Sequence, residues 1–265
     1  MTAYGRAVEL VHLDISSGVA TITLDSPDNR NALSTALVAG ILDALDGAEA
    51  GIADGSVRTI VLTHVAPAFC AGADLKERRK GVPDSTPIVT CFRRLMDAPV
   101  PTIAAVDGPA RAGGIGLLAS CDLVVVRSGV VFALTEVRIG VAAAIISVPI
   151  LRRANHSKLA AAFLTGEPFD AVAARDAGLV THVTDDVAGT VAELCAGIRM
   201  GAPRAVAETK HLLRLVPTLE RDEAFARMGA LSQALFSTPD AAEGMAAFAE
   251  KRPPSWQSED HPLEG

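Results

Sequence analysis

The residues best placed for chemistry in this sequence are glycines, which leave backbone N–H groups accessible to a ligand, rather than paired acids or bases. Residues 110–122 read ARAGGIGLLASCD, and Gly113-Gly114 lie between a predicted strand and a predicted helix. Gly72-Ala73 occupies the same kind of place earlier in the chain. The first turn of a helix has unpaired N–H groups and the positive end of the helix dipole. Two such turns that converge would hold an oxyanion, with about 3 kcal/mol of transition-state stabilisation for each donor. The alternative is that the glycines only allow close helix–sheet packing, and spacing alone leaves both open.

Composition narrows the class of protein. The chain has 265 residues, 49% of them hydrophobic, which is enough for a large core. A net charge of −7 and an aromatic content of 4% disfavour nucleic acid as a partner. The four cysteines, at positions 70, 91, 121 and 195, form no CxxC pair and sit in apolar surroundings. We therefore expect reduced, buried thiols in a cytoplasmic protein.

Neither a membrane span nor an export signal is predicted. No segment carries 18 uninterrupted apolar residues, the length that a transmembrane helix needs. The first fourteen residues, MTAYGRAVELVHLD, have charges where a signal peptide needs its apolar region.

Other catalytic motifs have little support. Gly114-Ile-Gly116-Leu-Leu-Ala119 matches the G-x-G-x-x-A pattern of dinucleotide-binding proteins, but Asp107 to Gly113 separate it from the preceding strand. The sequence has no P-loop, no G-x-S-x-G and no HExxH, and its histidines never pair at i, i+4. We expect no metal and no nicotinamide cofactor.

The pattern of apolar residues predicts an α/β fold, because strands alternate with helices. A hairpin is expected first, and Ser34 is the predicted N-cap of the first helix. Beyond residue 185 the pattern is helical to about residue 250. The predicted strands are 8–13, 18–24, 58–65, 101–106, 123–127 and 131–134, and the earlier predicted helices are 34–48, one starting in 73–80, 86–97 and 114–120.

Four segments, in order along nearly the whole chain, resemble the crotonase family of enoyl-CoA hydratases and isomerases. They are FCAGADLKE (69–77), AGGIGLLASCD (112–122), FALTEVRIGV (132–141) and MAAFAEKR (245–252). The resemblance implies an α/β spiral of ββα units over residues 1–190 and a C-terminal helical region over 191–265 that covers CoA and forms trimers. It also implies an acyl-CoA substrate, a homotrimer or dimer of trimers, and no cofactor other than the CoA carried by the substrate.

The resemblance also implies roles for individual residues. The backbone N–H groups of Ala73 and Gly113 would hold the thioester oxygen, and Glu136 would be the acid–base. Burial among apolar neighbours would raise the pKa of Glu136; the alternative is a structural carboxylate paired with Arg138. The residues implied in substrate and CoA binding are Arg30, Ala71, Ala73, Asp74, Leu75, Lys76, Gly113, Phe248 and Lys251. Asp74 would also cap a helix.

The sequence departs from the family at two positions. Ala112 stands for the first glycine of a triplet, and Gly116 stands where hydratases usually carry a first glutamate. The second departure resembles a bacterial subgroup that includes methylglutaconyl-CoA hydratases, which act on branched enoyl-CoAs with a remote carboxylate. Arg138 or Arg111 could then pair with that carboxylate, although solvated charges are the simpler interpretation.

A site with a single glutamate also resembles that of the Δ3,Δ2-enoyl-CoA isomerases. Because one acid is missing, a non-catalytic acyl-CoA-binding protein is a further alternative. For hydration, Ser120, Thr135 or a backbone carbonyl could replace the missing acid in holding the water. The sequence therefore favours a hydratase first, and leaves the isomerase and the binder open.

Overall fold

The computed structural model describes residues 9–79, 81 and 84–257, and its main element is a six-stranded sheet. The strand order is β1-β2-β3-β4-β6-β9; β1 and β2 pair antiparallel and all later neighbours pair parallel. A three-stranded sheet, β5-β7-β8, lies beside it. The strands are β1 (Val11–Ser16), β2 (Val19–Leu24), β3 (Thr59–His64), β4 (Thr102–Val106), β5 (Ala110–Arg111), β6 (Leu123–Arg127), β7 (Val131–Ala133), β8 (Phe169–Asp170) and β9 (His182–Thr184).

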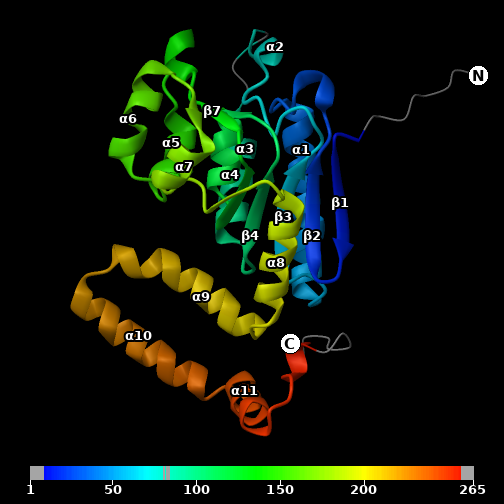
Figure 1. Ribbon diagram of the computed structural model, residues 1–265, viewed down its shortest axis with the longest axis vertical. Helices are drawn as coiled ribbons and strands as arrows, with labels where there is room; N and C mark the ends of the chain where they lie inside the picture. The colour runs from blue at the N-terminus through cyan, green and yellow to red at the C-terminus, as the bar shows by residue number, and fades with distance from the viewer. Residues whose placement is uncertain (1–8, 80, 82–83, 258–265) are drawn as a thin grey trace, which may run out of the picture.

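Helices cover both faces of the six-stranded sheet (Figure 1). The helices are α1 (Thr35–Ala53), α2 (Leu75–Arg78), α3 (Thr86–Asp97), α4 (Gly113–Ala119), α5 (Ala144–Leu151), α6 (His156–Thr165), α7 (Ala171–Asp176), α8 (Val187–Arg199), α9 (Pro203–Leu215), α10 (Arg221–Phe236) and α11 (Pro239–Glu250). The short 3-10 helices are Pro27–Asn29, Glu136–Ile139, Val216–Thr218 and Ser255–Gln257.

The alternation of side chains along the strands divides the core in two. In β3, Leu62 packs into the large core together with α1, α3 and α4, whereas Val61 packs into a smaller core on the other face. The smaller core is closed by Val187 and Cys195 of α8. Because successive strand residues point to opposite faces, parallel strands buried on both sides read as continuous apolar runs.

The predicted elements of the first half are present, with two differences. The first strand spans Val11–Ser16 instead of 8–13, where residue 8 lies outside the described residues, and β5 was not expected. The hairpin forms between β1 and β2, and α1 begins after Ser34, whose hydroxyl accepts a hydrogen bond from Leu37 N–H at 3.2 Å. The four cysteines are free and buried. The pattern missed β8, β9 and all of α5–α7, which fill residues 144–184.

The last three helices extend away from the sheet. Figure 1 shows α9, α10 and α11 as an arm below the core, and α10 has no buried residue. The expected boundary between the α/β core and the C-terminal helical region, at residue 190, falls inside α8. Because α8 packs on the sheet, the arm begins with α9. Within the described part of the chain, no helix is long and apolar enough to cross a bilayer.

Candidate active site

The two glycine-rich turns predicted to converge lie against each other. A Cβ built on Gly72 would lie 3.3 Å from Gly113 N and 2.8 Å from the Cβ of Ala112. Ala73 forms a parallel bridge to Leu33, in which Leu33 N–H donates to Gly72 O at 2.7 Å. The Ala73 N–H therefore points away from Leu33. Among the described residues, neither Ala73 N–H nor Gly113 N–H donates to a backbone carbonyl.

A buried asparagine braces the loop that carries Ala73. Asn31 is fully buried, and its amide donates to the carbonyls of Val65 at 3.1 Å and Ala68 at 2.8 Å. Its Oδ1 accepts from Ser26 N–H at 2.7 Å. Sequence reasoning singled out Arg30 and passed over Asn31, although a polar residue with a positive φ, here 54°, is typical of asparagine. The two carbonyls that the Asn31 amide binds lie more than thirty residues away in sequence, which no local pattern shows.

Pairing of two short strands places Glu136 near Gly113. Arg111 of β5 pairs with Ala133 of β7 in parallel, and Ala112 N–H donates to Ala133 O at 3.1 Å. Gly113 follows the end of β5 by two residues and Glu136 follows the end of β7 by three. Because parallel strands end at the same edge, both groups lie at one edge of the small sheet.

The Glu136 carboxylate is poorly solvated and is not paired with a base. Its Oε2 is buried and has no hydrogen-bond partner among the described residues. Burial raises the pKa of Glu136, partly opposed by a backbone hydrogen bond. Arg138, considered above as its partner, instead donates to Glu167 at 2.7 Å and to Thr165 O at 2.9 Å. The structural pairing with Arg138 is thus wrong.

Apolar side chains pack against Gly116, the position where the resemblance implies a first glutamate. A Cβ built on Gly116 would lie 2.8 Å from Ile146 Cγ2 and 2.8 Å from Phe92 Cζ. Ser120, one suggested substitute, is 1% exposed and donates its hydroxyl to Gly116 O at 2.8 Å. The backbone of α4 at Gly116 therefore packs directly against apolar groups.

A cavity of about 320 Å³ lies beside the Ala73 loop and contains two arginines. Its lining residues are Arg30, Pro67, Ala68, Cys70, Ala71, Pro109 and Arg111. Arg30 O accepts from Ala71 N–H at 3.0 Å, which fixes the rim of the cavity. A cavity lined by two arginines suits a phosphate.

The helix that follows the Ala73 loop begins as predicted. The Asp74 carboxylate accepts from Lys76 N–H at 2.8 Å and caps α2. Leu75 and Lys76 are exposed, and Glu77 is held by Thr35 through two hydrogen bonds of 2.9 Å. Lys76 is thus presented on an anchored turn.

Phe248 and Lys251 are not brought to this site within one chain. Both are exposed at the end of α11, and Phe248 is 85% exposed. Figure 1 shows α11 at the opposite end of the molecule from α2. These two residues can meet the loop of residues 71–76 only in another copy of the chain.

Comparisons with known proteins identify one family. A family model described as "Enoyl-CoA hydratase/isomerase" matches residues 14–259. A Thermus thermophilus protein, assigned by name to the enoyl-CoA hydratases, is 38% identical over 249 residues, covering 89% of this chain and 96% of its own.

Solved structures give the same fold. A Legionella pneumophila structure titled as an enoyl-CoA hydratase/isomerase (crotonase) is 30% identical with a TM-score of 0.87, covering 94% of this chain and 100% of its own. A Mycobacterium smegmatis enoyl-CoA hydratase is 32% identical with a TM-score of 0.85, covering 94% of this chain and 99% of its own.

The chain therefore belongs to the enoyl-CoA hydratase/isomerase family of enzymes, which act on acyl-CoA substrates. The expected crotonase-like α/β fold with a helical C-terminal region is confirmed.

The buried state of Glu136 predicts a stability gain on its neutralisation. The native pKa lies above the ordinary value, so the native state binds more protons in that window and its stability falls as pH rises through it. The native state therefore remains less stable at neutral pH than at acidic pH on account of Glu136. We expect Glu136→Gln to raise Tm at neutral pH, and the gain to vanish below about pH 4. Calorimetry with the exposed Glu167→Gln as control measures this; equal melting of wild type and Glu136→Gln at neutral pH contradicts it.

The packing at Gly116 predicts a second stability effect. Gly116→Ala adds a methyl group that overlaps Ile146 and Phe92, and we expect a loss of about 1–3 kcal/mol. The matched control is Gly197→Ala in α8, where nothing lies within 4 Å of the built Cβ and a gain of about 0.5–1 kcal/mol is expected. Urea unfolding compares the two. A Gly116→Ala protein as stable as Gly197→Ala would show open space at this position.

Proposed function

We propose that this enzyme is an enoyl-CoA hydratase in which the N–H groups of Ala73 and Gly113 hold the thioester oxygen and Glu136 is the single acid–base side chain. The observation that carries the proposal is that adjacent backbone segments bring together two N–H groups that donate to no described backbone carbonyl and a half-buried carboxylate whose Oε2 has no described partner. Donors fixed in this way stabilise charge that develops on the oxygen during reaction.

The proposed reaction adds water across the 2,3 double bond. Hydrogen bonds to the thioester oxygen draw electrons from C3, where the water oxygen bonds. Glu136 accepts one proton from that water, and the same proton goes to C2 when the enolate collapses, so the product gains one water. A raised carboxyl pKa suits both halves of this transfer, since the group must accept a proton and then release it.

The apolar packing beside Gly116 supports a second candidate function, the isomerisation of a 3-enoyl-CoA. Ile146 and Phe92 offer no hydrogen bond to a water, whereas moving a proton between C4 and C2 of a 3-enoyl-CoA needs only one carboxylate and an enolate site. Glu136 would take the proton at one carbon and return it at the other. Isomerisation is therefore the alternative activity of the same residues.

The finer choice of substrate follows from the charges near Glu136. A remote carboxylate would need a free cation; Arg138 is already bound to Glu167, and Arg111 lines the cavity described above. Several side chains that follow Glu136 are apolar and exposed, among them Ile139 at 60%. We therefore propose an enoyl-CoA with an apolar acyl group as the preferred substrate. The branched, carboxylated acyl group of the methylglutaconyl-CoA type is the second candidate.

CoA would lie along the Ala73 loop. The resemblance assigns Arg30, Ala71, Asp74, Leu75 and Lys76 to it, and the cavity with two arginines offers a place for its phosphates. Phe248 and Lys251 of a neighbouring subunit would complete the site. No cofactor beyond the substrate's own CoA is required, and the described residues hold no cluster of three or more metal-ligating side chains.

The test is a product assay with a matched pair of variants. The purified enzyme is incubated with crotonyl-CoA, 3-methylglutaconyl-CoA and a 3-enoyl-CoA, and the products are read by mass and NMR. We expect one added water on crotonyl-CoA and a fall of at least about a hundredfold in turnover in Glu136→Gln. Glu167→Gln, an exposed carboxylate paired with Arg138, should turn over normally.

Each other result has a definite meaning. An unchanged mass with a moved double bond establishes the isomerase in place of the hydratase. Binding without turnover of any substrate supports the non-catalytic binder and contradicts the proposal, as does near-normal turnover by Glu136→Gln.

The arm of helices supports assembly with other copies of the chain. α10 exposes Phe225 at 75% and Phe236 at 69%, and an apolar groove of about 650 Å³ lies between α9, α10 and α11. Exposed apolar surface of this extent marks an interaction site. We propose a second copy as its occupant, in a homotrimer or dimer of trimers, because Phe248 and Lys251 reach the Ala73 loop only from another chain.

Charges on this face should break the assembly. The double variant Phe225→Asp, Phe236→Asp is expected to reduce the mass measured by light scattering to that of one chain. Leu164→Asp on α6, equally exposed at 76%, is the control and should leave the mass unchanged. A wild-type monomer, or an unchanged mass in the double variant, would contradict the proposed interface.

A further inference from the structure

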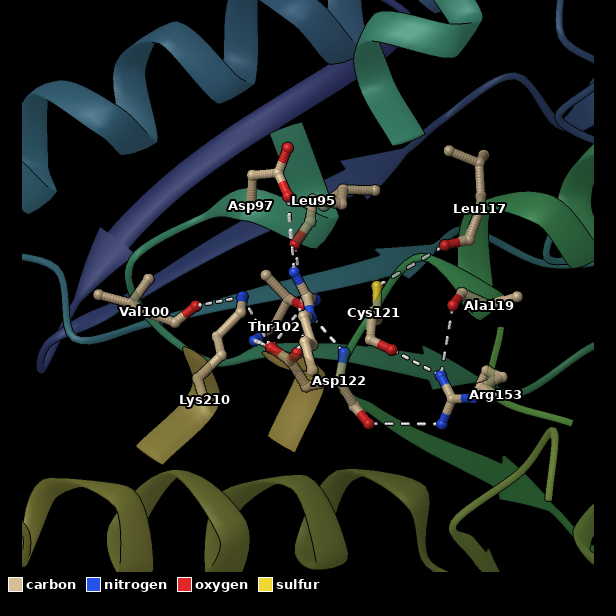
Figure 2. Close-up of polar contacts among 11 residues, drawn as sticks. Leu95, Asp97, Val100, Thr102, Leu117, Ala119, Cys121, Asp122, Arg153 and Lys210 are labelled. Carbon is tan, nitrogen blue, oxygen red and sulfur yellow. Dashed lines mark hydrogen bonds and ion pairs between the residues drawn. The ribbon is translucent and has the colours of Figure 1, made fainter. Parts of the chain in front are cut away.

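The end of α4 that lies farthest from Gly113 is held by an arginine from another segment. Figure 2 shows Arg153 beside the residues that follow the helix. Its Nη1 donates to Cys121 O at 2.5 Å and to Ala119 O at 3.5 Å, and its Nη2 donates to Asp122 O at 3.3 Å. One guanidinium thus binds three carbonyls at and just beyond the helix C-terminus, those of residues 119, 121 and 122, where a cation also opposes the helix dipole.

The same end of α4 is tied to the sheet and to the helical arm through the Asp122 side chain. Its Oδ2 accepts from Thr102 N–H at 2.8 Å and pairs with Lys210 of α9 at 2.8 Å. Its Oδ1 accepts from Arg214 of α9 at 2.9 Å. Lys210 is 7% exposed and also donates to Val100 O at 2.9 Å. Asp122 therefore joins β4 and α9. Arg153 instead donates to Ala119 O, the last carbonyl of α4, and to two carbonyls of the segment that follows it.

The position of α4 along its axis matters because the helix is short. It has seven residues, so its two ends are about 10 Å apart. On the side of the site, α4 has glycines in contact with other segments: Gly113 packs against Leu33, and Gly116 packs against Ile146. Glycine positions give no side chains to interlock on that side, so contacts at the ends help to set the axial position.

Arg153 also links α4 to the helix that covers it. It lies two residues beyond the end of α5, and α5 carries Ile146, which packs on Gly116. A shift of α4 relative to α5 would therefore pull the carbonyls away from the guanidinium. The cost of such a shift is high, because a partly buried charge loses its hydrogen bonds. The Nε of Arg153 already lacks a partner among the described residues.

We propose that Arg153 is a positioning residue that fixes α4 from its C-terminal end, and so holds the Gly113 N–H against the thioester oxygen. This inference rests on the proposed function, in which Gly113 donates to that oxygen. Arg153 touches no substrate and does not act as an acid or base. It acts through the hydrogen bonds to the carbonyls of residues 119, 121 and 122.

The experiment compares Arg153→Lys and Arg153→Gln with a matched control. Arg58 is also half-buried and donates to a backbone carbonyl, Gly201 O, at 2.6 Å, but it joins β3 to the start of α9. Arg58→Lys therefore removes the same kind of contact without touching α4. Steady-state kinetics are measured below the melting temperature of each variant, on whichever acyl-CoA the wild type turns over.

We expect Arg153→Lys to lower kcat by at least about tenfold, since a small displacement of a donor has that effect. KM should stay close to the wild-type value, because the proposed CoA contacts lie on the Ala73 loop. The fall in kcat should be larger in Arg153→Gln than in Arg153→Lys, and Arg58→Lys should keep the wild-type kcat. Equal losses in Arg58→Lys and Arg153→Lys would show general destabilisation and overturn the inference.

A spectroscopic measurement separates this inference from the proposed function. Crotonyl-CoA labelled with 13C at the thioester carbonyl is bound to Glu136→Gln, which prevents turnover, with and without Arg153→Lys. Hydrogen bonds to the oxygen lower the carbonyl stretching frequency, and only bound ligand on folded protein contributes the shifted band. We expect a clear downshift in Glu136→Gln and a smaller one in the double variant.

The two failures are distinct. No downshift in Glu136→Gln contradicts the proposed N–H donors themselves, whatever Arg153 does. A downshift of equal size in both proteins, with a normal kcat in Arg153→Lys, overturns the role of Arg153 and leaves the donors in place.

Discussion

The site depends on the close approach of two stretches of backbone, the Ala73 loop and the first turn of α4. The built Cβ of Gly72 would overlap the Cβ of Ala112, so any side chain at residue 72 would push the two N–H groups apart. Ala112 itself has a φ of 46°, a left-handed conformation that costs an L-residue about 1–3 kcal/mol. Asn31, the β5–β7 pairing and the contacts at the C-terminus of α4 hold this approach in place. The strained backbone at Ala112 therefore accompanies the close approach of the two segments.

The second feature of the site is that it holds one carboxylate, Glu136, where the resemblance noted in the sequence implies two. Packing of Ile146 and Phe92 on Gly116 leaves no place for another acid without rearrangement. The same burial that raises the pKa of Glu136 makes it a better proton carrier near neutral pH and a poorer contributor to stability. Hydration and isomerisation both begin from the enolate that the two amides would stabilise, so the choice between them depends on whether water is held near C3.

Much of the fold could be predicted from local patterns, and the rest could not for physical reasons. Ser34 and Asp74 cap their helices because N-cap chemistry is local, and β6 and α3 begin and end where the apolar pattern changes. Helix α5 was missed because AIISVPIL is apolar all round and contains a proline, which hides helical periodicity. The roles of Asn31 and Arg153 depend on carbonyls far away in sequence, and no spacing rule reveals them. The resemblance placed Glu136 and Gly116, but only the packing shows what fills the space beside Gly116.

The most direct test of the account is a crystal structure of Glu136→Gln with crotonyl-CoA bound. We predict that the thioester oxygen lies about 3 Å from both Ala73 N and Gly113 N, with C2 and C3 next to residue 136. A thioester oxygen bound to other groups, or an acyl chain directed away from residue 136, would contradict the account.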